Sequence, residues 1–266
     1  MLLCQISDLH IKTPGSLAYR VVDSAAYLRR CVDHLLAAGQ RPDVVVVTGD
    51  LTDSGRSEEY AHLRALLDPL PMPVYLLPGN HDDRAALRAS FPDHAYLFQM
   101  DRFVQYAVDA APLRLIALDS TIPGASGGEL CPLRLAWLEA RLSEAARQPV
   151  VIVTHHPPFA TGIGHMDSIG FADPGALEAI VRRYPNVERV LCGHLHRAIQ
   201  VRFGGTIAST CPSPAHQVAL DLDADAPSRF VLEPPGYELH WWDAARARLV
   251  SHTAFIGDFA GPYPFH

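Results

Sequence analysis

Short apolar runs alternate with amphipathic segments, and this alternation limits the possible folds more than any other feature of the chain. The runs LLCQIS, DVVVVT, VYLLP, RLIALD, PVVIVT and RVLC are rich in β-branched residues and almost continuously apolar. Such runs are typical of strands that are buried on both faces. Residues 24–39, 57–68, 132–148 and 173–184 lie between them and have the spacing of amphipathic helices. The alternation predicts an α/β layered fold with a mixed or parallel sheet.

The pattern changes after about residue 198. The segments AIQVRF, GTIAST, QVALDL, SRFVLE, YELHWW and RLVSHT look like strands joined by Gly, Pro and Asp turns, with no helix between them. We expect residues 198–266 to complete the sheet of a single domain spanning 1–266. The stretch 223–238 is rich in Pro and Asp, so we expect it to be an exposed excursion.

Charge and composition exclude several classes of protein. The net charge is −7, which argues against a protein that binds long nucleic acid. No apolar run approaches the length of a membrane span, and the N-terminus has no basic region of a signal peptide. The five cysteines are odd in number and include no CxxC pair. A reducing cytoplasm without membrane attachment is therefore the expected location.

Metal-binding side chains follow five of the predicted strands. These residues are Asp8 and His10, Asp50, Asn80, His155, and His194 with His196. Ligands of α/β proteins bind at the carboxyl ends of strands, so the five ends predict one pocket rich in donor atoms. In extended chain the two members of D-x-H, or of H-x-H, project to the same side. Gly49, Gly79 and Gly193 would allow close backbone approach at these ends.

The donor types and their number predict two metal ions. His, Asp and Asn without Cys suit Mn, Fe, Zn or Co. Seven donors are too many for one ion but are enough for two divalent ions that share a bridging carboxylate. Ions in such pairs lie about 3.5–4 Å apart and bind both the attacking and the leaving oxygen of a phosphoryl group. Two carboxylates leave the pair positively charged, which favours an anionic substrate.

Other residues near these motifs have more than one interpretation. His156 could be the ligand in place of His155, but adjacent strand residues point in opposite directions, so only one of them is expected to face the metals. His165, in GIGHMDS, could line the pocket or be an ordinary loop residue. His216, in SPAHQV, fits a turn. Asp53, in DSG, also fits a structural turn.

The motifs D-x-H, G-D, G-N-H-D, H-x-P and G-H-x-H, in this order between residues 8 and 196, resemble the calcineurin-like metallophosphoesterase superfamily. The resemblance implies a four-layer α/β/β/α sandwich, with a small cap or a C-terminal β excursion. LLPGNHDDR, THHPP, SPAHQV and FAGPYPF are similar to bacterial glycerophosphodiester phosphodiesterases and to class III cyclic-nucleotide phosphodiesterases. This similarity also implies a homodimer or a larger homo-oligomer.

The resemblance assigns a role to each candidate residue. Asp8, His10, Asp50 and His196 would bind one ion, and Asp50, Asn80, His155 and His194 the other, with Asp50 as the bridge. His81 would contact the substrate or protonate the leaving group, and the catalytic set would be His81, Asn80 and Asp50. His216 would lie near the active site, where His81, His165 and His216 are the candidate substrate-binding residues.

The expected activity is hydrolysis of small phosphodiesters, either glycerophosphodiesters or 3′,5′-cyclic nucleotides, by attack of a metal-activated hydroxide on phosphorus. The alternatives are a phosphomonoesterase or a nucleotide pyrophosphatase that uses the same centre. A non-catalytic scaffold of this fold would be expected to have lost metal ligands. All seven are present in this chain, so an enzyme is expected.

Overall fold

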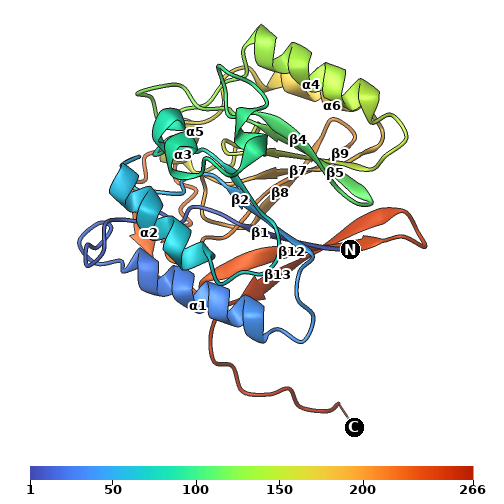
Figure 1. Cartoon of the computed structure of the whole chain (residues 1–266). Helices are drawn as coiled ribbons and strands as arrows, with labels where there is room; N and C mark the ends of the chain where they lie inside the picture. The colour runs from blue at the N-terminus through green and yellow to red at the C-terminus, as the bar shows by residue number, and fades with distance from the viewer. Residues whose placement is uncertain (266) are drawn as a thin grey trace.

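The computed structural model describes residues 1–265 and places two β-sheets face to face between two layers of helices (Figure 1). The first sheet has the order β13-β12-β1-β2-β3. Its strands are β1 (Leu2–Ile6), β2 (Val44–Thr48), β3 (Val74–Leu77), β12 (Gly236–Asp243) and β13 (Arg248–Phe255). β1, β2 and β3 are parallel, and β12 and β13 are antiparallel to their neighbours. The predicted four-layer α/β/β/α sandwich is confirmed.

The second sheet has the order β4-β5-β6-β7-β9-β8. Its strands are β4 (Tyr106–Ala110), β5 (Leu113–Leu118), β6 (Val150–Thr154), β7 (Val187–Cys192), β8 (Ile199–Phe203) and β9 (Thr206–Thr210). β5, β6, β7 and β9 run parallel, whereas β4 and β8 are antiparallel edge strands. Both sheets are therefore mixed, and the strands after residue 198 extend both of them.

Helices cover the outer face of each sheet. Side chains of α1 (Ser24–Ala37) and α2 (Ser57–Leu67) pack with the first sheet, and those of α4 (Pro132–Glu144) and α6 (Pro174–Arg183) pack with the second. The carboxylate of Asp23 accepts from the Ala26 amide and caps α1, while Pro132 and Pro174 start α4 and α6. No helix among residues 1–265 is long and apolar enough to cross a membrane.

Three short elements surround the ends of the sheets: α3 (Arg84–Ser90), the 3-10 helix η1 (Ala95–Phe98) and α5 (Gly164–Asp167). These elements, and also β4, were not expected from the sequence. β4 is an edge strand that reads YAVDA and lacks the β-branched run of the central strands, and α3 has only seven residues. Sequence periodicity is a weak signal over such lengths.

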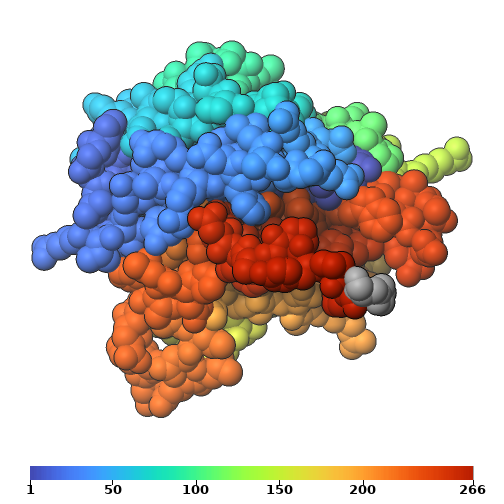
Figure 2. Space-filling view, turned by 90° about the horizontal axis from the view of Figure 1, so that it is seen from below, coloured from blue at the N-terminus to red at the C-terminus, as the bar shows by residue number. Residues whose placement is uncertain are grey.

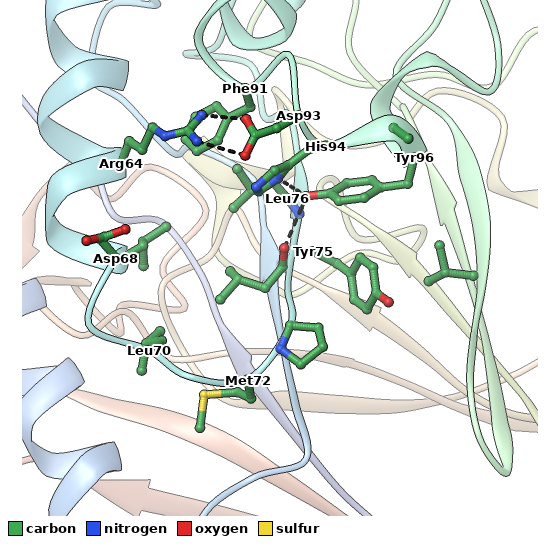
Figure 3. Close-up of a pocket in the computed structure, with 15 residues that line it drawn as sticks. Arg64, Asp68, Leu70, Met72, Tyr75, Leu76, Phe91, Asp93, His94 and Tyr96 are labelled. Atoms are coloured by element: carbon green, nitrogen blue, oxygen red, sulfur yellow. Dashed lines mark hydrogen bonds and ion pairs between the residues drawn. The ribbon is translucent and has the colours of Figure 1, made fainter.

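Side chains from the segment that contains η1 close one edge of the sandwich. Figure 3 shows the Tyr96 hydroxyl beside β3, where it accepts a hydrogen bond from the Leu76 amide at 3.0 Å and donates one to the Val74 carbonyl at 3.1 Å. The Gln99 side chain likewise pairs with both backbone groups of Ala107 on β4. Edge strands with free backbone groups can pair with other chains, and these contacts block such pairing.

Residues 211–235, called the excursion from here on, leave the second sheet after β9 and return to β12. The expected exposed stretch of 223–238 was wrong at its end, because residues 236–238 are buried in β12. The excursion contains one two-stranded ribbon, β10 (Gln217–Val218) with β11 (Phe230–Val231). In Figure 2 part of this orange segment protrudes from the molecular surface. The excursion packs against the loop after β1 through Ala18, Val22 and Ala215, with Phe230 beside them. It therefore brings late residues of the chain to the carboxyl ends of the strands.

Candidate metal centre

All seven predicted metal ligands lie together at the carboxyl ends of β1, β2, β3, β6 and β7. The hydrogen bonds between β1 and β2 continue past the ends of the two strands, where the amides of Asp8 and His10 donate to the carbonyls of Gly49 and Asp50. The backbone there is not extended, contrary to our expectation. Asp8, His10, Asp50, His194 and His196 all have φ between 45° and 70°, the left-handed region that non-glycine residues seldom adopt. Strain of this kind is typical of functional sites.

One group of donors surrounds one oxygen of Asp50. The His10 Nε2 atom lies 3.5 Å from Asp50 Oδ2 and 3.2 Å from His196 Nε2. His196 Nε2 is 3.6 Å from Asp8 Oδ1. The Nδ1 atom of His196 lies 2.9 Å from the His216 carbonyl oxygen, which only accepts, so Nδ1 carries the proton and Nε2 keeps a lone pair. Asp8, His10, Asp50 and His196 therefore offer donor atoms to one point.

A second group surrounds the other oxygen of Asp50. His155 Nε2 lies 3.4 Å from Asp50 Oδ1 and 3.1 Å from Asn80 Oδ1. His155 Nδ1 donates to the Thr48 carbonyl at 2.8 Å, which orients the ring. The His194 ring lies 5.2 Å from that of His155, and His194 Nε2 is buried. The two groups meet at the carboxylate of Asp50.

These donors fit divalent cations. Asp8 and Asp50 are almost fully buried, and Asp8 Oδ2, His10 Nδ1 and His194 Nε2 have no hydrogen-bond partner among the described residues. Buried carboxylates and bare imidazole nitrogens are costly unless a cation or a proton satisfies them. Residues 1–265 contain four groups of donor side chains close enough together to hold an ion. Three of these groups consist only of buried residues, and each of the three includes at least one predicted ligand. The site thus suits metal binding.

The two carboxyl groups differ in pKa. Burial raises the pKa of Asp8 to about 6. Burial also opposes ionisation of Asp50, but His155 and His81 outweigh it and hold the pKa of that carboxyl well below its usual range. Burial lowers the pKa of His155, yet Asp50 outweighs burial and raises that pKa to about 9. A proton and a cation therefore compete for the same His155 nitrogen.

Two of the glycines that precede metal-binding residues, Gly79 and Gly193, leave no room for a side chain. A Cβ atom on Gly193 would lie 2.2 Å from Ser7 Oγ and 2.7 Å from the Thr48 carbonyl oxygen. A Cβ on Gly79 would lie 2.2 Å from Asp50 Oδ1. These distances are far below contact distance, so the loops can pass close to the centre only without side chains.

Asp53 and His81 lie beside the first group. His81 Nδ1 donates to the Asp53 carbonyl at 2.9 Å, and its backbone amide donates to Asp50 Oδ1 at 3.0 Å. The Asp53 carboxylate lies 3.6 Å from His10 Nδ1 and pairs with Lys12. The sequence suggested only a turn at Asp53. Its side chain instead faces a predicted ligand, and a carboxylate near a histidine ligand orients the ring.

The sequence motif G-N-H-D contained a further structural residue that we had given no role. The carboxylate of Asp82 accepts from the amides of Leu51, Thr52 and Gly79 and from the Tyr60 hydroxyl, at 2.9–3.1 Å. It ties the loop after β2 to the loop after β3, and these loops carry Asp50 and Asn80. Asp82 could have been found from its place in the G-N-H-D motif. The helical pattern around Tyr60 gave no sign of the hydrogen bond from Tyr60 to Asp82.

A cavity of about 380 Å³ opens above the donors, and His10, Asp50, Asn80, His194 and His196 line it. His81, His165 and His216, the candidate substrate-binding residues, also line it. Its outer wall includes Tyr19, Ser126, Arg229 and Phe230, which sequence reasoning missed. The rings of Tyr19, His216 and Phe230 are 5.1–5.3 Å apart. Tyr19 and Phe230 come from distant parts of the chain, and no local pattern marks such a contact.

A larger cavity, of about 520 Å³, lies at the closed edge of the sandwich (Figure 3). Tyr75, Tyr96 and Met72 line it, together with the ion pair between Arg64 and Asp93, whose oxygens lie 2.7–2.8 Å from the guanidinium nitrogens. None of the potential metal-binding groups found among residues 1–265 lies there. Chemistry, and not volume, therefore identifies the functional cavity.

Comparison with known proteins agrees with this geometry. The model of the calcineurin-like phosphoesterase family matches residues 1–198. A probable glycerophosphodiester phosphodiesterase (GpdQ) of Arcobacter nitrofigilis is 40% identical, over 100% of this chain and 97% of that protein. A cAMP/cGMP dual specificity phosphodiesterase of Mycobacterium tuberculosis is 33% identical, over 84% of this chain and 70% of that protein.

A solved structure has the same fold. The dimetal phosphatase of Danio rerio superimposes with a TM-score of 0.68 over 96% of this chain and 98% of that one, at 18% identity. Because the family match covers residues 1–198 and the Arcobacter relative aligns along the whole chain, the chain belongs to the calcineurin-like phosphoesterase family.

Proposed function

We propose that the chain is a metal-dependent phosphodiesterase that hydrolyses small phosphodiesters, with glycerophosphodiesters and 3′,5′-cyclic nucleotides as the candidate substrates. The carboxylate of Asp50 carries the argument, because its two oxygens face two separate groups of donors, 3.5 Å from His10 Nε2 and 3.4 Å from His155 Nε2. A shared carboxylate of this kind is what a dinuclear centre requires. The names of the relatives support the same reaction.

The assignment of ligands follows the two groups. In this proposal Asp8, His10, Asp50 and His196 hold one divalent ion, and Asp50, Asn80, His155 and His194 hold the other. The donor set, with no cysteine, suits Mn, Fe, Zn or Co. Metal ions held by these residues would supply Lewis acidity, which would polarise a phosphate oxygen and lower the pKa of a water molecule. Asn80 contributes a neutral oxygen, which adds no negative charge beside an anionic substrate.

His81 is proposed to serve the leaving group. Its Nδ1–H is fixed on the Asp53 carbonyl, so Nε2 is the nitrogen left to hold a proton for the departing alkoxide. The carboxylate of Asp53 keeps His10 in place from the other side. His165 and His216 are proposed to contact the substrate, since both line the cavity and each has a buried Nδ1 without a partner among the described residues.

Domain organisation, assembly and location are also proposed. We propose one domain over residues 1–266, in which residues 198–266 add strands and form the cap over the pocket, and in which they also contact other copies in a homodimer or a larger oligomer. The protein is expected to act in the cytoplasm, because all five cysteines are free. Long nucleic acid is not an expected partner, given the net charge of −7.

Metal content and substrate choice test the proposed function. The purified protein should contain two divalent ions per chain by elemental analysis. It should hydrolyse bis(p-nitrophenyl) phosphate faster than p-nitrophenyl phosphate, and it should act on a glycerophosphodiester or on cyclic AMP. A preference for the monoester throughout would indicate the phosphomonoesterase alternative, and cleavage only of a nucleotide anhydride would indicate a pyrophosphatase.

The ligand assignment has its own test. His194→Ala and His196→Ala should each lower the affinity for one ion, and the two variants should affect different ions. Competition with a fluorescent chelator resolves the two binding steps. If both variants lost the same ion, the division into two groups would be wrong.

A further inference from the structure

The loop of residues 119–128 forms one wall of the active-site cavity, and its base is firmly anchored. It follows β5 and carries Ser126 to the cavity. Asp119 is buried and pairs with Arg84, with Nε 2.5 Å from Oδ2, and Arg84 also donates to the Thr121 carbonyl at 2.8 Å. These contacts fix the first residues of the loop. Backbone hydrogen bonds hold the far end of the loop, from the Glu129 amide to the Ser120 carbonyl and from the Gly128 amide to the Gly170 carbonyl. None of these bonds is made by Ser126 itself.

His156 contacts Ser126 directly. Its side chain is fully buried, and its Nε2 atom lies 3.1 Å from the Ser126 carbonyl oxygen. Its Nδ1 atom lies 2.8 Å from Ser120 Oγ. A carbonyl oxygen only accepts, so Nε2 carries the proton and Nδ1 accepts from the Ser120 hydroxyl. Both nitrogens of His156 are thereby engaged with the loop, and neither is free for a metal.

The neighbouring histidine has the opposite role, although the two rings are only 4.8 Å apart. His155 directs Nε2 to Asp50 and Asn80. His156 turns to the other side of the strand end, where the backbone of Gly128 lies so close that a Cβ there would be 2.3 Å from the ring. The ring of His156 is also 4.8 Å from that of His194. It therefore fills the space between the donors and the loop.

We propose that His156 is a positioning residue, which holds the Ser126 segment at the cavity so that this wall is in place before substrate binds. This inference rests on the proposed phosphodiesterase function. It predicts that loss of the contact between His156 and Ser126 weakens substrate binding without removing a metal ion. It also gives a reason for two adjacent histidines at the end of β6, of which one faces the metals and the other faces the loop.

Two substitutions separate the contacts of His156. An Asn amide reaches the position of the imidazole Nδ1 and not that of Nε2, whereas a Gln amide reaches the position of Nε2. His156→Asn therefore loses the bond to the Ser126 carbonyl, and His156→Gln can keep it. We expect KM for bis(p-nitrophenyl) phosphate to rise about tenfold in the Asn variant, the value of one buried hydrogen bond. In the Gln variant the rise should be about twofold or less.

Two further measurements do not depend on turnover. Elemental analysis should give two ions per chain in both variants, as in the wild type. Hydrogen exchange, followed by mass spectrometry on the peptide that spans residues 119–130, should be faster in His156→Asn and close to wild type in His156→Gln. If the wild type proves not to be a phosphodiesterase, the proposed function fails, while hydrogen exchange still tests the positioning role.

The controls use a histidine away from the cavity and a second way to weaken the contact. His34 lies on α1 and bonds to the Tyr237 hydroxyl at 3.0 Å, so His34→Asn and His34→Gln should leave KM unchanged. Should His156→Asn not fold, Ser120→Ala removes the partner of Nδ1 and should give a smaller rise in KM and faster exchange of the loop. The proposal would be overturned if the Asn and Gln variants at position 156 had the same KM, or if neither differed from wild type. It would also be overturned if Ser120→Ala had no effect or if a variant lost one ion.

Discussion

The floor and the rim of the cavity are built in different ways. The floor consists of the seven proposed metal ligands, which come directly from strand ends and, apart from the half-buried Asn80, are buried. The rim consists of Tyr19, Ser126, His165 and residues 228–230, which come from loops and from the excursion. Tyr19 is 48% exposed, although its ring contacts Phe230 and His216. Sheet geometry thus fixes the proposed metal ligands, and loop contacts fix the residues proposed to meet the rest of the substrate.

The family match separates one part of the rim from the floor. It ends at residue 198 and so includes the whole floor and also Tyr19, Ser126 and His165 of the rim, whereas residues 228–230 lie beyond it. Substitutions on the floor should therefore abolish the reaction, and substitutions on the rim should change which substrate is bound. The following variants test that division.

The largest effect is expected at Asp50. Asp50→Asn keeps the size of the side chain but removes the charge that both donor groups share, so at least one ion should be lost and kcat/KM should fall about 10³-fold or more. Elemental analysis and the bis(p-nitrophenyl) phosphate assay measure this. Asp109→Asn, on the exposed face of β4, is the matched control and should behave as wild type. An Asp50→Asn protein with two ions and normal turnover would contradict the bridging role.

The next effect is expected at His81, where the floor meets the rim. His81→Ala should lower kcat about 100-fold, as expected for loss of a general acid, while two ions remain bound. The defect should be smaller for a substrate whose leaving group is a weak base, such as p-nitrophenolate, than for one that releases an alkoxide. His252→Ala, on the exposed part of β13, provides the control. An equal loss for both leaving groups would argue against proton donation.

A third effect concerns the stability of the fold and the buried side chain of His240 on β12. His240 is fully buried between Gln5 and Ser251, at 3.2 Å and 2.7 Å, and burial lowers its pKa to about 3. The unfolded chain, with a histidine pKa of about 6.5, binds this proton more readily, so His240 destabilises the fold as the pH falls below 6.5. Between pH 7 and pH 5 the wild type should lose about 2 kcal/mol more of its unfolding free energy than His240→Gln does.

Urea unfolding at the two pH values, in the presence of a chelator, measures this difference. Ser251→Ala keeps the imidazole and should therefore keep the pH dependence of the wild type. If His240→Gln and the wild type lost stability in parallel, the buried imidazole would not be the cause.

The smallest effect is expected on the rim. Phe230→Ala removes the ring that contacts Tyr19 and His216, and we expect KM to rise about fivefold while kcat changes about twofold or less, because a partly exposed aromatic contact contributes on the order of 1 kcal/mol. Phe259→Ala, in the exposed C-terminal segment, is the control. A fall in kcat as large as that of His81→Ala would place Phe230 with the catalytic residues and break the division.

The two regions also differ in how well the sequence predicted them. The floor was found because each donor directly follows a continuous apolar run, and strands of this kind end at a common edge. Six strands were likewise indicated after residue 198, and the structure has one at each place, although those within QVALDL and SRFVLE are only two residues long. The left-handed backbone at the donors was not predicted, since an alternation rule assumes extended chain.

The rim could not be found in the same way. The contact of Tyr19 with Phe230 joins a loop after β1 to the excursion before β12, and neither segment has a periodic pattern. Asp53 was interpreted as a turn residue because its role depends on the distance of its side chain from His10, which only the folded chain defines. His156 is similar: its sequence position suggested a possible ligand, and its hydrogen bonds connect it to Ser126 instead.

The left-handed conformation of five proposed ligands has a consequence for how tightly metals bind. Asp8, His10, Asp50, His194 and His196 have positive φ values, and each such residue costs about 1–3 kcal/mol. Hydrogen bonds of the protein itself support these conformations: the amides of Asp8 and His10 donate to the carbonyls of Gly49 and Asp50, and the His194 amide donates to Asp8 Oδ1. Asp82 holds the loop that carries Asp50. An incoming ion therefore meets a preorganised backbone and loses little affinity to reorganisation. The free-energy cost of arranging the donors belongs to the folding equilibrium and not to the metal-binding equilibrium.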